Sequence, residues 1–170
     1  MDVLALVKSA FALFAIVDPV GVIPIFLLAT RGYSLAQSHA AARIAALTVL
    51  GVLTLFTFAG EPLLAFFGIR LAAFSVAGGL LLLLLALSMV QAHVSPQRQT
   101  EDEAAEAEER DAVGVVPLGV PLLAGPGAIT HVIVAAGPAQ GSVGQLSLLL
   151  IPVALVALSV WLAFRAAPLI

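Results

Sequence analysis

The chain has 170 residues, of which 62% are hydrophobic and only 10% are charged, and its mean hydropathy is +1.16. A soluble domain is about 45–50% apolar and about 25% charged, so this composition excludes a soluble enzyme and a disordered tail. Seven basic residues, none of them clustered, exclude a nucleic-acid binder. The chain has no cysteine, which excludes disulfides, thiolate metal sites and cysteine nucleophiles.

Five stretches reach the length of about 20 apolar residues that a membrane helix needs. They are Val3–Ala29, Ala40–Ala59, Leu71–Val90, Val113–Ala136 and Gln145–Ala166. The first lacks the short apolar core, basic start and small-residue cleavage site of a signal peptide, so we interpret it as a span. The sequence predicts an all-α, polytopic helical membrane protein with a single transmembrane domain over residues 1–170.

Lysine and arginine in short loops indicate the orientation, because cytoplasmic loops carry more of them. One side holds Lys8 and Arg70, and the other holds Arg31, Arg43, Arg98, Arg110 and Arg165. We therefore expect the larger group to face the cytoplasm and the N-terminus to lie outside. Glu61 and Arg70 bracket a short outer segment and are candidates for a surface ion pair.

One hydrophilic segment of some length, residues 91–112, separates the third and fourth spans. Seven of the ten acidic residues lie in it, between Glu101 and Asp111. We interpret it as an acidic cytoplasmic loop, with partner binding as the alternative. It divides a first three-helix repeat, residues 1–90, from a partial second repeat, residues 113–170.

Proline and glycine interrupt the first and fourth spans near their middles. The first contains Asp18-Pro-Val-Gly-Val-Ile-Pro-Ile-Phe26, and the fourth contains Pro121-Leu-Leu-Ala-Gly-Pro-Gly-Ala-Ile-Thr130. Proline lacks an N–H and ends or kinks a helix, and aspartate before proline is typical of a helix start. We expect two half-helices in each span, the second beginning at Pro19 and at Pro126. Proline kinks packed against neighbouring helices are the alternative.

Both interruptions fall in the first span of a three-span unit. Because a unit with an odd number of spans reverses direction, the two broken spans enter from opposite faces and their half-helix N-termini converge at the midplane. This arrangement is an inverted repeat of three-helix units with broken first and fourth spans. The second unit is incomplete, and we expect that truncation of the sequence removes a sixth span; a family member with five spans is the alternative.

With these two motifs the sequence resembles the MarC family of integral membrane proteins, also called the neutral amino acid transporter family. The resemblance extends over the whole chain in span order and in the polar loop between the third and fourth spans. It implies six spans and a bacterial inner-membrane protein that transports or exports small neutral amino acids.

Two converging half-helix N-termini offer unpaired N–H groups and partial positive charge, which suit a carboxylate. We expect a substrate carboxylate at Gly125–Ala128, where glycine permits a close approach to the backbone, and a hydroxyl from Thr130. The predicted substrate-binding residues are Asp18, Pro19, Gly21, Pro24, Gly125, Pro126, Gly127 and Thr130.

Asp18 is the one acid near mid-membrane, where ionisable residues are costly and are functional by default. It either caps the half-helix that follows it, or it attracts a substrate ammonium group or carries a coupling proton. A cap favours the ionised form and desolvation favours the protonated form, so the two roles conflict on charge.

The other polar residues point to packing rather than chemistry. We expect hydroxyls in the spans to bond to their own helices, at Thr48, Thr54, Thr57, Ser75, Ser88, Ser147 and Ser159. His131 is expected to pack between helices, and Gly78-Gly79 to permit close helix packing. The sequence has no residues at the spacing of metal ligands, no catalytic triad and no phosphate-binding loop. We therefore expect no enzyme activity, no metal and no cofactor.

The function expected from these features is secondary transport or export of small neutral solutes, amino acids above all, across the bacterial inner membrane. The expected partners are the lipid bilayer, a small neutral amino acid and a coupling proton or sodium ion, with no nucleic acid. A homo-oligomer is left open. The alternative is a non-transporting membrane protein that assembles or regulates a complex, and a lipid-modifying membrane enzyme is a weaker one.

Overall fold

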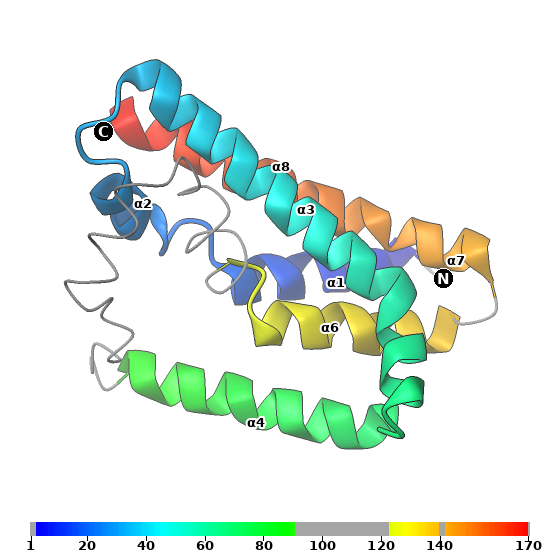
Figure 1. The fold of residues 1–170 in the computed structure, drawn as a ribbon. Helices are drawn as coiled ribbons and strands as arrows, with labels where there is room; N and C mark the ends of the chain where they lie inside the picture. Colours follow the sequence, from blue (N-terminus) through cyan, green and yellow to red (C-terminus); the bar gives the residue numbers. More distant parts are fainter. Residues whose placement is uncertain (1–2, 91–122, 140–141, 170) are drawn as a thin grey trace.

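The computed structural model describes residues 3–90, 123–139 and 142–169, and in this part of the chain every regular element is a helix (Figure 1). This confirms the all-α prediction for the described residues. The acidic loop and the first part of the fourth span lie outside them. The helices are α1 (Val3–Val17), α2 (Ile23–Ala29), α3 (Leu35–Phe66), α4 (Leu71–Val90), α6 (Pro126–Ala136), α7 (Val143–Leu148) and α8 (Leu150–Ala166), with 3-10 turns at η2 (Gly137–Ala139) and η3 (Ala167–Leu169).

Helix α3 contains the second predicted span but begins five residues earlier, because a capping box fixes its start. The backbone N–H of Gln37 donates to Ser34 Oγ (3.3 Å), and the N–H of Ser34 donates to Gln37 Oε1 (2.8 Å). Two helical stretches of the described residues are long and apolar enough to cross a membrane, Leu35–Phe66 and Val143–Ala166. Helix α4 has the bounds predicted for the third span.

The fifth predicted span is two helices with a turn between them. Helix α7 ends at Leu148 and α8 begins at Leu150. Pro152 has no N–H to bond to the carbonyl of Leu148, so the helical ladder is interrupted there. Leu149 keeps right-handed helical dihedrals, with φ −70° and ψ −14°, and the chain continues as α8.

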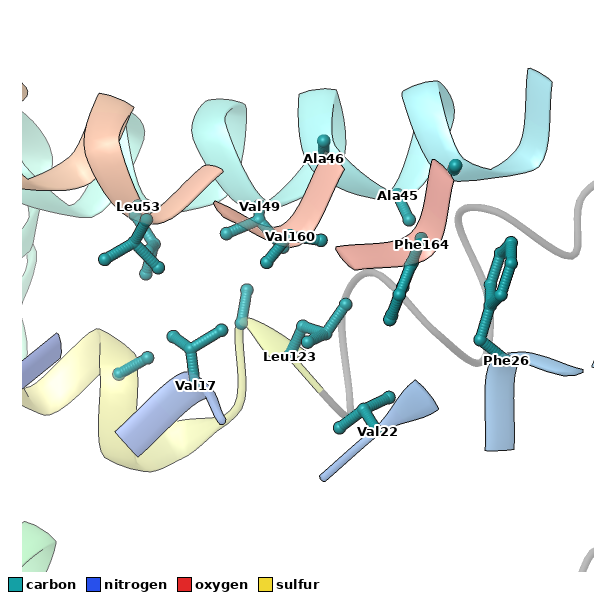
Figure 2. Close-up of a cluster of buried hydrophobic side chains, with 14 of the residues drawn as sticks. Val17, Val22, Phe26, Ala45, Ala46, Val49, Leu53, Leu123, Val160 and Phe164 are labelled. Carbon is teal, nitrogen blue, oxygen red and sulfur yellow. The ribbon is translucent and has the colours of Figure 1, made fainter. Parts of the chain in front are cut away.

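Helices α3 and α8 pack side by side along most of their length, and α1 and α6 lie against them (Figure 1). Phe26 of α2 stacks on Phe164 of α8 with ring centroids 4.3 Å apart. Figure 2 shows these rings at one end of a continuous apolar cluster. Its fully buried members include Leu13, Val49, Leu53, Leu123, Val160 and Phe164.

Candidate functional site

The first span is broken between Val17 and Ile23, as the sequence predicts. Asp18 has a φ of 43°, in the left-handed region that asparagine and aspartate tolerate better than most residues. Regular helix resumes at Ile23, with Pro24 in the first turn of α2. The predicted restart at Pro19 is therefore wrong by four residues. The second proline of the motif was the signal for the true position.

The carboxylate of Asp18 caps the turn that joins α1 to α2. Its Oδ1 accepts a hydrogen bond from the backbone N–H of Gly21 at 3.0 Å, and its own N–H donates to the carbonyl of Phe14 at 2.9 Å. A Cβ at position 21 would collide with this carboxylate, which explains the glycine. The predicted cap of the following half-helix is therefore wrong: Asp18 caps the connecting turn, whereas the N-cap residue of α2 is Val22, without a side-chain hydrogen bond.

We predict that Asp18→Asn leaves the stability of the protein nearly unchanged and that Asp18→Ala lowers it by about 2 kcal/mol. Asparagine tolerates the left-handed conformation and can accept the Gly21 hydrogen bond, whereas alanine loses the cap and strains the backbone. Thermal unfolding of both variants in detergent measures this difference. Equal losses in the two variants would contradict a cap.

Helix α6 begins at Pro126, where the sequence places the second half-helix, and the stretch of the fourth span before residue 123 lies outside the described residues. Gly125 is the N-cap residue in an extended conformation, and no side chain caps the helix start. The N–H of Ile129 donates to the carbonyl of Gly125 at 3.1 Å, which closes the first turn. The N-terminus of α6 thus lacks the side-chain oxygen that usually satisfies its first N–H groups.

Gly127 and Thr130 have packing roles in addition to any role toward a ligand. A Cβ at Gly127 would meet Leu82 of α4 and Ile16 of α1, so glycine lets both helices approach α6. The hydroxyl of Thr130 donates to the carbonyl of Pro126 at 2.7 Å and is used within its own helix. The same back-bonding, predicted from the sequence, occurs at Thr48, Thr57, Ser75, Ser147 and Ser159.

Helices α1 and α6 run in opposite directions. Ile16 lies next to Gly127, near the two breaks, and Ser9 Oγ lies 3.0 Å from His131 Nε2 further along both helices. The contact positions move toward the N-terminus of α1 as they move toward the C-terminus of α6, so the two helices are antiparallel. His131 therefore packs between helices, as predicted, and ties α1 to α6 by a hydrogen bond.

Apolar contacts bring the two breaks together. Val17 and Val22 flank the first break and belong to the same buried cluster as Leu123 and Ala128 beside the second (Figure 2). Pro19 is buried, whereas Asp18, Gly21 and Pro24 are exposed.

A pocket of about 280 Å³ lies between α3, α4 and α6. Of the eight predicted site residues, only Pro126 and Thr130 line it. Gly78, which the sequence indicates as a packing residue, also lines this pocket, and a Cβ there would collide with Thr130 of α6. Gly60 also lines the pocket but was not predicted from the sequence. A Cβ at Gly60 would collide with Ile133 of α6. Among the described residues, the lining is Phe56, Gly60, Leu63, Leu64, Phe74, Ala77, Gly78, Leu81, Pro126, Ile129, Thr130 and Ile133.

Apolar helices and half-helices of this kind define a helical integral membrane protein. The profile of the MarC family of integral membrane proteins matches residues 3–170, and the chain belongs to this family.

Several curated relatives are similar over most of the chain. UPF0056 membrane protein YhcE of Escherichia coli is 38% identical over 161 residues, covering 95% of this chain and 74% of the relative. UPF0056 membrane protein BU267 of Buchnera aphidicola is 35% identical over 167 residues, covering 98% and 77%. UPF0056 membrane protein MJ1677 of Methanocaldococcus jannaschii is 38% identical over 141 residues, covering 82% and 68%. No solved structure matches the chain.

Proposed function

We propose that the chain is a secondary transporter or exporter of small neutral solutes, with amino acids as the substrates. The observation that carries this proposal is the pair of broken spans. Helices α1 and α6 are antiparallel, each adjoins a break, and apolar contacts join the two breaks. Discontinuous helices in corresponding positions of two halves are typical of transporter binding sites.

The substrate carboxylate in this proposal binds at the start of α6, where the N-cap residue Gly125 has no side chain to compete for the N–H groups. The turn Asp18–Pro24 forms the opposite wall, and Asp18 is available to an ammonium group because its side chain is exposed. The transported solute is not chemically altered, so the mechanism needs no enzyme activity and no cofactor. A proton or sodium gradient supplies the energy.

The topology that goes with this mechanism is an inverted repeat in the bacterial inner membrane, multi-pass, with the N-terminus outside. The antiparallel course of α1 and α6 supports it, because an inverted repeat requires the two broken spans to enter from opposite faces. Its partners are the bilayer lipids, the solute and the coupling ion, without nucleic acid. Self-association into a homo-oligomer is compatible with it.

We predict saturable counterflow of labelled alanine in proteoliposomes that contain the chain. Unlabelled alanine should compete, while alaninamide, which has no carboxylate, should compete at least tenfold less, because it cannot occupy the helix N-terminus. Labelled glutamate serves as the charged control solute.

The absence of alanine counterflow in folded, correctly inserted protein would contradict the proposal. It would favour the alternative of an assembly or regulatory membrane protein, whose broken helices serve packing alone. Equal competition by alanine and alaninamide would be consistent with transport but would refute the carboxylate site at α6.

A further inference from the structure

The pocket between α3, α4 and α6 is a slot that follows the helix axes. On α4 its lining runs from Phe74 to Leu81, and on α3 from Phe56 to Leu64. At 1.5 Å per residue these stretches are roughly 10 Å and 12 Å long. The lining residues recur every three or four positions, so the slot extends along one face of each helix for about two turns.

Among the described residues, the slot offers no free polar side chain to a ligand. Within that part of the chain, the polar side chain in its wall is that of Thr130, whose hydroxyl donates to the carbonyl of Pro126. Apolar cavities of roughly half this volume stay dry and bind apolar molecules. An alkyl chain therefore fits the slot, whereas the charged groups of a zwitterionic amino acid would find no partner in it.

The slot opens on the outside of the helices. Leu63 of α3 and Leu81 of α4 line it and are each 44% exposed. The mouth thus lies between two helix faces that a membrane protein presents to lipid.

A cationic side chain, that of Arg70, lies one helical turn from the end of the slot. The N–H of Phe74, a lining residue, donates to the carbonyl of Arg70 at 3.1 Å, which places Arg70 at the start of α4. Arg70 is exposed and forms no ion pair within the described residues, so the expected pairing with Glu61 is wrong there. The neighbouring Phe66 and Phe67 are 83% and 65% exposed, as expected of a connection at the membrane surface.

We propose that this slot and Arg70 form a site for an anionic phospholipid. The lipid phosphate binds the guanidinium of Arg70, and one acyl chain lies in the slot between α3 and α4 and reaches Thr130 of α6. An arginine fork suits a phosphate, and an apolar slot of this length suits an alkyl chain. The lipid belongs to the leaflet that the α3–α4 connection faces.

A tryptophan reporter in the slot tests the site. Trp161 is the single tryptophan, so Trp161→Phe gives a silent background. Phe74→Trp then places a reporter in the slot, and Val76→Trp places the control on the same helix outside it, at a position 74% exposed. Leu81→Trp is a second slot reporter in case position 74 does not tolerate the change.

The reporters are read in the full chain reconstituted with brominated phosphatidylglycerol or brominated phosphatidylcholine. We expect the slot reporter to prefer the anionic lipid about fivefold, since a basic residue near the surface contributes about 1 kcal/mol. The control reporter should show a ratio near one. Arg70→Gln should bring the slot ratio close to one.

Filling the slot provides a second measurement. Ala77 lines it, whereas Ala73 on the same helix is exposed outside it. Ala77→Leu should reduce quenching by both lipids, and Ala73→Leu should not. Equal ratios at the slot and control reporters, or an Arg70→Gln variant that keeps the preference, would overturn the lipid site.

Adding inorganic phosphate distinguishes a lipid headgroup from free phosphate as the ligand of Arg70. Loss of the lipid preference at millimolar phosphate would assign Arg70 to free phosphate and refute the lipid site. A preference that persists supports it. Because no transported solute is present, a negative result here leaves the proposed transport function standing, and a failure of counterflow leaves the lipid site standing.

Discussion

Gly78→Ala is expected to destabilise the protein by about 1–3 kcal/mol, the usual cost of inserting a methyl group into a close contact between helices. A Cβ at Gly78 would collide with Cγ2 and Oγ1 of Thr130 on α6. Thr130 cannot turn aside without losing the bond from its hydroxyl to the carbonyl of Pro126. Among the described elements α4 packs mainly on α6, so the substitution weakens the principal attachment of α4.

Gly79→Ala is the matched control on the neighbouring position of α4. A Cβ at Gly79 meets nothing within 4 Å. Alanine should therefore keep stability unchanged or raise it by roughly 0.5–1 kcal/mol through the higher helix propensity. Unfolding of the two variants by heat or sodium dodecyl sulfate, followed by circular dichroism, measures the difference. Equal stabilities would contradict close packing of α4 on α6 at this position.

The sequence predicted best where local chemistry decides. Proline and glycine placed an interruption at Asp18, which occurs in the structure, and a helix start at Pro126, where α6 begins. The third span matched α4 because its apolar stretch continues from Leu71 to Val90, and the polar segment begins at the next residue. The second predicted span, in contrast, covers only the most apolar part of α3. The helix begins earlier, because its start depends on the capping box at Ser34.

Contacts between helices could not be predicted from the same signals. Helices that are apolar on all sides carry no periodic pattern to say which face meets which neighbour. The Ser9–His131 hydrogen bond, the contact of Gly60 with Ile133, and the slot beside them therefore emerge only in three dimensions. The same limit applies to the candidate site: the breaks were predicted, but the packing around Gly127 was not.

The stacked pair Phe26–Phe164 supports the second half of the first span, and Phe164→Ala is expected to destabilise it strongly. Both rings are fully buried, and their centroids are 4.3 Å apart. Removing one ring leaves a hole on the order of 100 Å³, which at about 24 cal/mol per Å³ of cavity costs about 2 kcal/mol. Any lost ring stacking adds about 0.5–1.5 kcal/mol.

The loss should be concentrated in α2, because this helix has seven residues and depends on α8 and η3 for its contacts. Hydrogen exchange should become faster for the α2 amides than for those of the α3–α8 pair, since short elements with few contacts open first. Phe11→Ala is the control, as Phe11 is 73% exposed on α1. If both variants lowered stability equally, or if α2 kept its protection in Phe164→Ala, the ring stack would not be what holds this half-helix in place.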